Sequence, residues 1–215
     1  VYPDALKLAG IGESSLLYKT WSRINTRLFR RAHRLYTTGE GQSKLMEKYA
    51  PSGKVEIINL WPGLRNASPV PKEINPFVTE HNLKGKFVVE YSGNMGGTHN
   101  VEALVEVASL LKDEQDILFL LIGRGTKMEK IRLDSQQRGL SNIMMLPFQP
   151  DDIIRYSLAA ADISVVLVEE GAASVSVPSK IYNLLAVGSP LLTISPRESE
   201  VERLIRKYKA GRNFS

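Results

Sequence analysis

The stretch FVVEYSGNMGGTH, residues 87–99, decides the fold of this chain. Residues 87–91 form a short apolar run that predicts a strand, and residues 92–99 form a loop with three glycines. Four further apolar runs follow, separated by segments with the spacing of amphipathic helices. This alternation is typical of βαβ units. It predicts an α/β fold with a Rossmann-like, doubly wound parallel sheet that helices cover on both faces.

The expected elements of this sheet lie between residues 87 and 208. Strands are predicted at 87–91, 117–122, 142–146, 163–167 and 191–194, and helices at about 101–112, 127–138, 151–160, 179–187 and 198–208. In a doubly wound sheet the first and fourth strands are neighbours, and ligands bind beyond the carboxyl ends of the strands at that point. We therefore expect the loops at 92–99 and 169–178 to face each other across one cleft.

We expect residues 1–68 to form part of a second, incomplete α/β domain and residues 69–215 to form the ligand-binding domain. The first part is expected to hold a helix within 14–35, a strand at 35–38, a helix to about residue 49 and a strand at 55–59. The segment that contains Pro69, Pro71 and Pro76 is the expected linker.

The helix within residues 14–35 is basic and amphipathic. Six cations follow Glu13 without another acid up to Arg34. Its apolar stripe comprises Leu16, Leu17, Trp21, Ile24, Leu28 and Leu35. One interpretation is contact with an anionic membrane surface or an anionic lipid-linked substrate. The other, which the needs of a compact domain favour slightly, is a buried apolar stripe with the cations on a solvated face.

Composition excludes several classes of protein. The 215 residues are 43% hydrophobic and 24% charged, which is ordinary for a globular protein. The absence of cysteine excludes disulfide frameworks and thiolate metal sites and fits a reducing, cytoplasmic compartment. The longest apolar run, residues 117–122, is too short to span a bilayer. The net charge of +5 comes without a nucleic-acid motif, so nucleic acid is not an expected ligand. The sequence contains no cluster of metal ligands, so a metal ion is not expected either.

The segment VPSKIY, residues 177–182, places a lysine where a helix begins. Pro178 suits the first turn of a helix, whereas the helix dipole disfavours Lys180 there. One resolution is an anion bound by Lys180 and the free N–H groups, and the alternative is a lysine turned into solvent. His99 poses the same problem after the glycine loop, so a diphosphate between His99 and Lys180 is expected. The alternative for His99 is a neutral side chain bonded to the backbone.

The glycines of the loop, Gly93, Gly96 and Gly97, let a phosphate approach backbone N–H groups closely. Their spacing differs from the G-x-G-x-x-G pattern of dinucleotide sites. The second strand ends in Gly123-Arg124-Gly125 and lacks the acid that binds the ribose of NAD. Because Arg124 suits the phosphate of NADP, an NADP-dependent oxidoreductase stays as an alternative.

Several short motifs together resemble the C-terminal half of a family 4 glycosyltransferase of the two-domain GT-B type. The resemblance runs from VYPDAL at residues 1–6 to the end of the chain, and it rests on the order and spacing of these motifs. They are YSGNMG at 91–96, LIGRG at 121–125, LPF at 146–148, AAD at 160–162, VPSKIY at 177–182 and GSP at 188–190. The subgroup resembled includes bacterial capsule, O-antigen and exopolysaccharide transferases.

The resemblance implies a UDP- or GDP-sugar donor in the cleft between two Rossmann-like domains, without a permanent cofactor or a metal. Asn94 and His99 stand where the family carries an arginine and a lysine on the donor diphosphate. Asn183 stands where the family carries a ribose-binding glutamate. The loop from Gly123 to Thr126, with Arg124, and the side chain of Phe148 lie where the family holds base and ribose. For Phe148 alone, core packing is favoured.

The resemblance also implies a reaction: retaining transfer of a hexosyl or acetamidohexosyl group to a lipid-linked glycan at the inner face of the plasma membrane. Lys180 and His99 would stabilise the leaving diphosphate, helped by the N–H and hydroxyl of Ser179. Only the end of the acceptor domain is represented, so this fragment is expected to transfer little. A non-catalytic, membrane-associated binding module is a further alternative, suggested by the basic helix.

Overall fold

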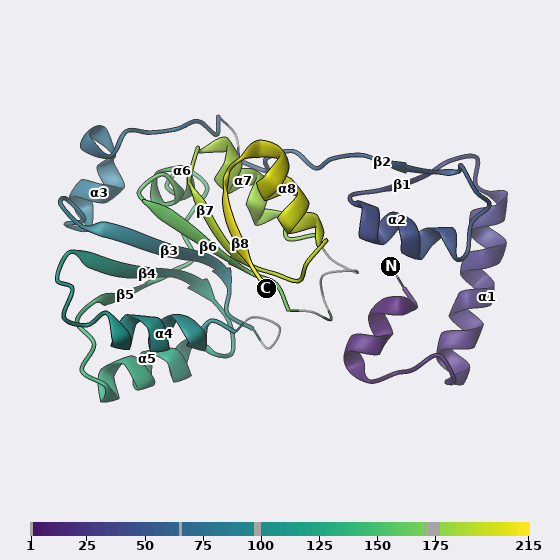
Figure 1. Cartoon of the computed structure of the whole chain (residues 1–215), viewed down its shortest axis with the longest axis horizontal. Coiled ribbons are helices and arrows are strands. Elements are labelled where there is room, and N and C mark those ends of the chain that lie inside the picture. The colour runs from purple at the N-terminus through teal and green to yellow at the C-terminus, as the bar shows by residue number, and fades with distance from the viewer. Residues whose placement is uncertain (1, 65, 97–99, 170, 172–176) are drawn as a thin grey trace.

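The computed structural model describes residues 2–64, 66–96, 100–169, 171 and 177–215, and it shows two α/β units that one extended segment joins (Figure 1). The larger unit contains a six-stranded sheet in the order β5-β4-β3-β6-β7-β8. Every neighbouring pair in it is parallel. The prediction of a doubly wound parallel sheet is therefore confirmed.

The strands of this sheet follow the apolar runs of the sequence. They are β3 (Phe87–Asn94), β4 (Ile117–Arg124), β5 (Ile143–Pro147), β6 (Ile163–Leu167), β7 (Leu191–Ile194) and β8 (Gly211–Phe214). The first and fourth of them, β3 and β6, are neighbours, as predicted. The sixth strand, β8, was missed because its sequence GRNF lacks the apolar run that predicts a buried strand.

Helices cover both faces of the sheet. On one face lie α4 (Glu102–Leu110) and α5 (Met128–Gln137), which share a core cluster with Leu121. On the other lie α3 (Pro76–Glu80), α6 (Ile154–Leu158), α7 (Lys180–Ala186) and α8 (Glu200–Tyr208). Leu120 belongs to that second face, because successive side chains of a strand point to opposite sides.

The expected linker is partly wrong. The proline-rich segment contains a short 3₁₀ helix at Lys72–Ile74, and α3 begins at Pro76. Asn75 caps α3 by accepting a hydrogen bond from the Phe77 N–H at 3.0 Å. Pro76 suits the first helical position, where no backbone donor is needed. Proline at this place therefore starts a helix that buries Phe77 and Val78.

The smaller, N-terminal unit is built on a two-stranded parallel sheet. Its elements are a 3₁₀ helix at Asp4–Ala9, α1 (Leu16–Arg31), β1 (Leu35–Thr37), α2 (Glu40–Glu47) and β2 (Val55–Ile57). Asp4 is buried in its centre and accepts hydrogen bonds from the hydroxyls of Tyr18 and Tyr49 at 3.0 and 2.9 Å. A buried polar network holds this unit together.

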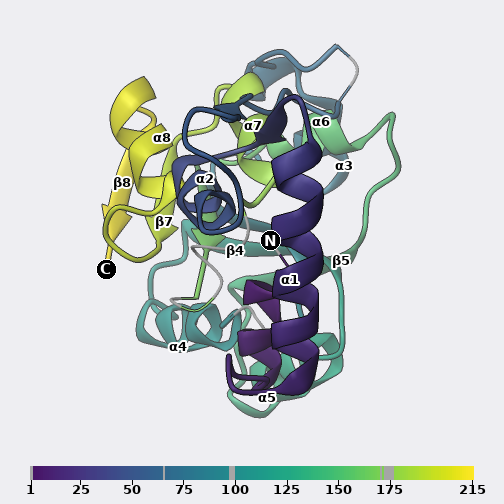
Figure 2. The ribbon, with the colours of Figure 1, turned by 90° about the vertical axis from the view of Figure 1, so that its right-hand side faces the viewer.

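The prediction of a buried apolar stripe on α1 is wrong. Leu16, Leu28 and Ile24 are 78%, 56% and 50% exposed, whereas Tyr18 and Asn25 on an adjoining face are buried. Figure 2 shows α1 in front, running along the outside of the N-terminal unit. The helix therefore packs through a polar and aromatic face and leaves Leu16, Ile24 and Leu28 exposed, whereas Trp21 of the stripe stacks on Tyr2.

Contacts between the starts of α2 and α8 join the units. The carboxylate of Glu200 at the start of α8 accepts a hydrogen bond from the N–H of Glu40, at the start of α2, at 3.1 Å. Arg203 bridges the same two acids, at 3.0 Å from Glu40 and 3.6 Å from Glu200. None of the helices in the described ranges combines the length and the hydropathy of a bilayer span.

Candidate functional site

The carboxyl ends of β3 and β4 form one wall of the candidate site. Gly93 and Gly123, expected in loops, are paired strand residues, with φ of 151° and 153°. A Cβ on Gly123 would stand 1.8 Å from the carbonyl oxygen of Gly93, so no other residue fits there. The glycines thus let the two strand ends run side by side as far as Asn94 and Arg124.

The turns that follow β3 and β4 are hydrogen-bonded to each other. The N–H of the buried Met95 donates to the carbonyl of Arg124 at 2.8 Å, and the N–H of Lys127 donates to the carbonyl of Met95 at 3.0 Å. Gly125 is needed here, because a Cβ on it would lie 2.4 Å from the Met95 oxygen. The glycine motifs of the sequence therefore shape a fixed pair of turns.

The other wall lies across a gap between β3 and β6. These strands pair only at Val89–Ile163 and Glu90–Ser164, and beyond that point β3 pairs with β4 alone among the described strands. The Lys180 side chain reaches across this gap from α7. Its Nζ lies 3.4 Å from the position that a Cβ on Gly93 would take and 3.9 Å from the ring centroid of Tyr91.

The Lys180 ammonium is buried, and within the described residues its Nζ has no hydrogen-bond partner. Burial lowers the pKa of Lys180 to about 8, although the charge of Glu90 acts to raise it. Of the two possibilities that the sequence leaves open, a lysine in solvent is therefore not what the fold adopts. A buried ammonium without an acceptor is costly, which points to an anionic ligand in the gap.

Glu90 is a second buried ionisable side chain, which sequence reasoning missed. It is fully buried on β3, and burial raises its pKa to about 8 against the opposing effects of a 3.4 Å hydrogen bond from Ser164 and the charge of Lys180. The Ser164 hydroxyl also lies 2.7 Å from that of Ser189. A single carboxylate inside an otherwise apolar strand was the available signal.

Other predicted residues lie around the gap with varied exposure. Asn94 and Ser179 are exposed, and the amide of Asn94 lies over Gly96. Asn183 is used by the fold, because its Oδ1 accepts a hydrogen bond from the N–H of Gly63 at 2.8 Å. This bond ties α7 to the segment between the two units.

Arg124 and Phe148 form a contact of their own. The Arg124 guanidinium carbon lies 5.8 Å from the Phe148 ring centroid, and Phe148 is 52% exposed. The expectation of core packing for Phe148 is therefore wrong. Phe148 directly follows β5, whose end neighbours β4, so the topology brings both side chains to the same edge as Gly93 and Gly123.

Two predicted residues, Gly97 and His99, lie outside the described residues, as does most of the loop at 169–178. The described ranges contain no group of three or more histidines and acids placed to hold a metal ion. Within the described residues, the candidate site thus consists of Lys180, the ends of β3 and β4, and the Arg124–Phe148 contact.

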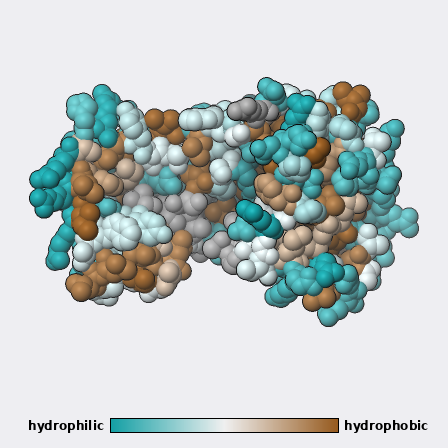
Figure 3. All heavy atoms as spheres, turned by 180° about the vertical axis from the view of Figure 1, so that it is seen from behind, coloured by the Kyte–Doolittle hydropathy of each residue, from teal (hydrophilic) through white to brown (hydrophobic). Residues whose placement is uncertain are grey.

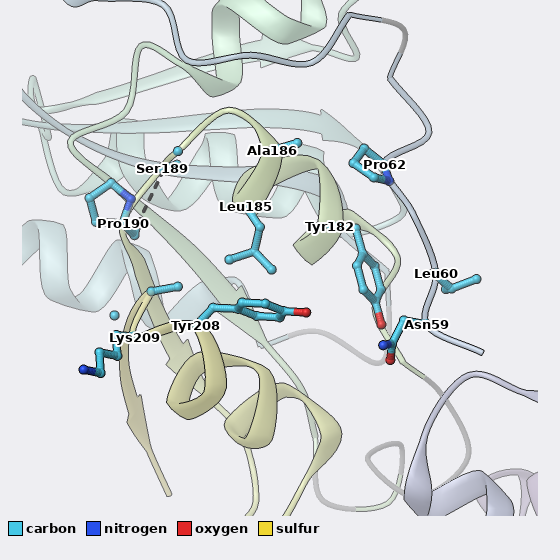
Figure 4. Close-up of a pocket in the computed structure, with 13 residues that line it drawn as sticks. Asn59, Leu60, Pro62, Tyr182, Leu185, Ala186, Ser189, Pro190, Tyr208 and Lys209 are labelled. Carbon is cyan, nitrogen blue, oxygen red and sulfur yellow. Dashed lines mark hydrogen bonds between the residues drawn. The ribbon is translucent and has the colours of Figure 1, made fainter. Parts of the chain in front are cut away.

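A pocket of about 730 Å³ lies elsewhere (Figure 4). Its walls come from the segment between the units, from α7 and from α8, with Leu60, Tyr182 and Tyr208 among the lining side chains. Ser189 and Gly211 place it at the amino ends of β7 and β8. The pocket therefore lies at the end of the sheet where the strands begin, opposite to the end that carries Gly93 and Arg124.

Comparisons with known proteins agree on one family. The family model described as "Glycosyl transferases group 1" matches residues 72–213. Over 218 residues the chain is 30% identical to WbjE, a probable glycosyltransferase of Pseudomonas aeruginosa, and the match covers 99% of this chain and 54% of WbjE.

Solved structures show the same fold. HepE of Anabaena, in complex with UDP and glucose, superposes with a TM-score of 0.70 at 14% identity over 92% of this chain and 53% of HepE. WaaG, a glycosyltransferase involved in lipopolysaccharide biosynthesis, superposes with a TM-score of 0.72 at 16% identity over 100% of this chain and 59% of WaaG. The GT-B-type fold is confirmed, and the chain spans about half the length of each of these relatives.

Proposed function

Because the chain belongs to the group 1 glycosyl transferases, we propose that it forms the donor-binding half of a retaining glycosyltransferase in bacterial surface polysaccharide biosynthesis. Residues 69–215 bind the nucleotide-sugar donor, and residues 1–68 are the end of the acceptor domain. The donor is a UDP- or GDP-sugar, and UDP is the first choice because HepE was solved with UDP. The acceptor is a lipid-linked glycan.

One observation carries this proposal: the Lys180 ammonium is buried in the gap between β3 and β6 without an acceptor among the described residues. The donor diphosphate supplies that acceptor. Charge-assisted bonds from an ammonium to phosphate oxygens are strong, and burial strengthens them further. Gly93, Asn94, Gly96 and Gly97 border the diphosphate, and His99 completes its surroundings.

The remaining residues hold the nucleoside. Gly123 and the contact between Arg124 and Phe148 offer a flat, cationic surface to the base. Ser179 adds its hydroxyl at the start of α7. The Oδ1 of Asn183 already accepts from Gly63, so a bond to a ribose hydroxyl uses the amide nitrogen of Asn183.

The proposed chemistry breaks the bond between the anomeric carbon and the diphosphate oxygen of the donor. The acceptor hydroxyl oxygen forms the new glycosidic bond with retention of configuration, and its proton passes to the leaving diphosphate. Negative charge grows on the leaving diphosphate, and Lys180 with His99 stabilises it there.

Calorimetric titration of the chain with UDP, GDP and NADP tests the donor assignment. We expect UDP or GDP to bind and Lys180→Met to weaken that binding about 100-fold, because a charge-assisted contact is lost. Lys84→Met, which removes an exposed lysine just before β3, at the end of that strand away from Gly93, is the matched control. Binding of NADP alone would favour an oxidoreductase, and equal effects of the two substitutions would refute the diphosphate assignment.

We further propose that α1 holds the protein at an anionic membrane surface on the cytoplasmic side. Five cations of α1 have no ion-pair partner within the described ranges: Lys19, Arg23, Arg27, Arg30 and Arg31. They flank the exposed apolar stripe of the same helix. Hydrophobic and hydrophilic surfaces accordingly lie side by side at the end of the molecule that this unit forms (Figure 3). A helix with both features suits the boundary between lipid headgroups and acyl chains.

Co-sedimentation with phosphatidylcholine vesicles, with and without one quarter phosphatidylglycerol, tests the membrane proposal. Replacing Arg23, Arg27, Arg30 and Arg31 by glutamine should weaken retention on the anionic vesicles at least about tenfold. The control carries glutamine at four lysines outside α1, at positions 84, 112, 130 and 209. Retention that is equal for both variants, or independent of phosphatidylglycerol, would contradict the role of α1.

A further inference from the structure

Tyr91 contacts both walls of the candidate donor site. Its side chain is fully buried on β3, next to the point where β3 and β6 stop pairing. Its ring lies beneath the Lys180 ammonium, with 3.9 Å between Nζ and the ring centroid. Its hydroxyl donates a hydrogen bond of 2.8 Å to the carbonyl oxygen of Asn94. One side chain therefore spans from α7 to the end of β3.

The ring gives the Lys180 ammonium a fixed place. A lysine side chain has four rotatable bonds, and no hydrogen bond from a described residue restrains this one. The negative face of an aromatic ring attracts a cation, and the attraction grows when water is excluded. The ring directs Nζ toward Gly93, where the missing side chain leaves room for it.

The Tyr91 hydroxyl fixes the position of the other wall, the carboxyl end of β3. Burial raises the pKa of Tyr91 well above its ordinary value, so the hydroxyl keeps its proton and remains a donor. Its bond to the Asn94 carbonyl fixes the peptide group that leads into Met95. The Met95 N–H in turn bonds the Arg124 carbonyl at 2.8 Å. The turn after β3 is thereby tied to the same ring that carries the lysine.

We propose that Tyr91 is a positioning residue of the donor site, which sets the distance between the Lys180 ammonium and the turn after β3 so that a diphosphate fits between them. This inference rests on the proposed function. The ring acts through Lys180, and the hydroxyl acts through the backbone of Asn94. The two effects are separable, because Tyr91→Phe removes only the hydroxyl and Tyr91→Leu removes both.

The first test needs no donor. A group above the face of an aromatic ring has its proton resonances shifted upfield, so the terminal methylene of Lys180 should be shifted in the NMR spectrum of the unliganded chain. Tyr91→Phe keeps that shift and Tyr91→Leu abolishes it. Assignment comes from the resonance that Lys180→Met removes. A Lys180 methylene that is unshifted in the wild-type chain would overturn the placement itself.

The second test is a double-mutant cycle on UDP affinity, measured by ligand-observed NMR because weak complexes remain visible to it. Tyr91→Leu should weaken UDP binding about tenfold in the wild-type chain but only about threefold, the share of the hydroxyl, in the Lys180→Met background. Tyr91→Phe should weaken it about threefold in both. Tyr156→Leu is the matched control, since the Tyr156 ring also carries a cation, Arg155 at 4.3 Å, but lies on α6.

The outcomes separate the two proposals. If UDP and GDP fail to bind the wild-type chain while the ring shift is present, the donor assignment fails and the geometry stands. If UDP binds and needs Lys180, but Tyr91→Leu has the same effect in both backgrounds, the positioning role of Tyr91 is overturned. Circular dichroism of each variant excludes loss of folding as the cause of weaker binding.

Discussion

The two units of the molecule each bury an ionisable side chain, Asp4 in the N-terminal unit and Lys180 in the larger one. Asp4 has partners: two tyrosine hydroxyls within 3.0 Å and the Lys48 ammonium at 3.4 Å. Lys180 has a ring beneath it and no hydrogen-bond acceptor within the described ranges. A satisfied buried charge supports the fold, whereas an unsatisfied one calls for an explanation. The proposed donor diphosphate supplies that explanation in the larger unit.

Asp4→Ala gives the largest effect expected from this contrast. It leaves the hydroxyls of Tyr18 and Tyr49 buried without their acceptor and should lower the free energy of unfolding by about 3 kcal/mol. Both tryptophans of the chain, Trp21 and Trp61, lie in or next to the N-terminal unit, so urea unfolding followed by tryptophan fluorescence measures it. A loss below about 1 kcal/mol would show that Asp4 does not organise this unit.

The pH dependence of stability should have a minimum near pH 8. The raised pKa of Glu90, about 8 against an ordinary 4.5, makes the folded chain bind more protons between these values, so stability falls there as pH rises. The lowered pKa of Lys180, about 8 against 10.5, has the opposite sign, and stability recovers above pH 8.

Urea unfolding at a series of pH values measures this profile. The acid limb should be the larger, because the pKa of Glu90 is shifted further than that of Lys180. Glu90→Gln should flatten the acid limb, and Lys180→Met should flatten the alkaline one. The contribution of Asp4 to stability depends on pH in the opposite sense to that of Glu90. Burial acts to raise its pKa, but the bonds from Tyr49 and Tyr18 and the charge of Lys48 leave it lowered, so its contribution is lost only as pH falls below about 4. A stability profile without a minimum near pH 8 would contradict the burial of Glu90 and Lys180.

Lys180→Met should stabilise the empty chain by about 1 kcal/mol at pH 7, because a flexible apolar side chain replaces an unsatisfied buried ammonium. The same substitution weakens nucleotide binding, so stability and binding move in opposite directions. Thermal unfolding with and without UDP measures both. A destabilised variant would mean that Lys180 serves the fold in the way that Asp4 does.

Phe148→Ala gives the smallest effect. Phe148 is half exposed and contacts Arg124 at the surface, so the free energy of unfolding should change by less than about 0.5 kcal/mol. UDP affinity should fall about threefold because the base loses an aromatic neighbour. Titration with UDP and with inorganic diphosphate separates the contribution of the base from that of the phosphates, since diphosphate affinity should stay unchanged. A fall in diphosphate affinity would place Phe148 at the phosphates.

The sheet was predictable because its physical signals are local. Short apolar runs at residues 87–91, 117–122 and 163–167 alternate with amphipathic segments, and each became a strand in the expected place. Strand β8 carries no such run and was missed. The apolar stripe of α1 misled the prediction, because periodicity identifies a helix but does not say which of its faces the neighbouring chain will cover.

The sequence by itself determined the parallel α/β fold, the family resemblance and the unusual position of Lys180, since each depends on residue order and spacing. Only the tertiary structure decided where the lysine points. Its burial depends on the gap between β3 and β6, on the absent side chain of Gly93 and on the ring of Tyr91, which come from three separate segments. The same holds for Glu90: a carboxylate in a strand is visible in the sequence, but its burial and its raised pKa arise only when helices close over the sheet.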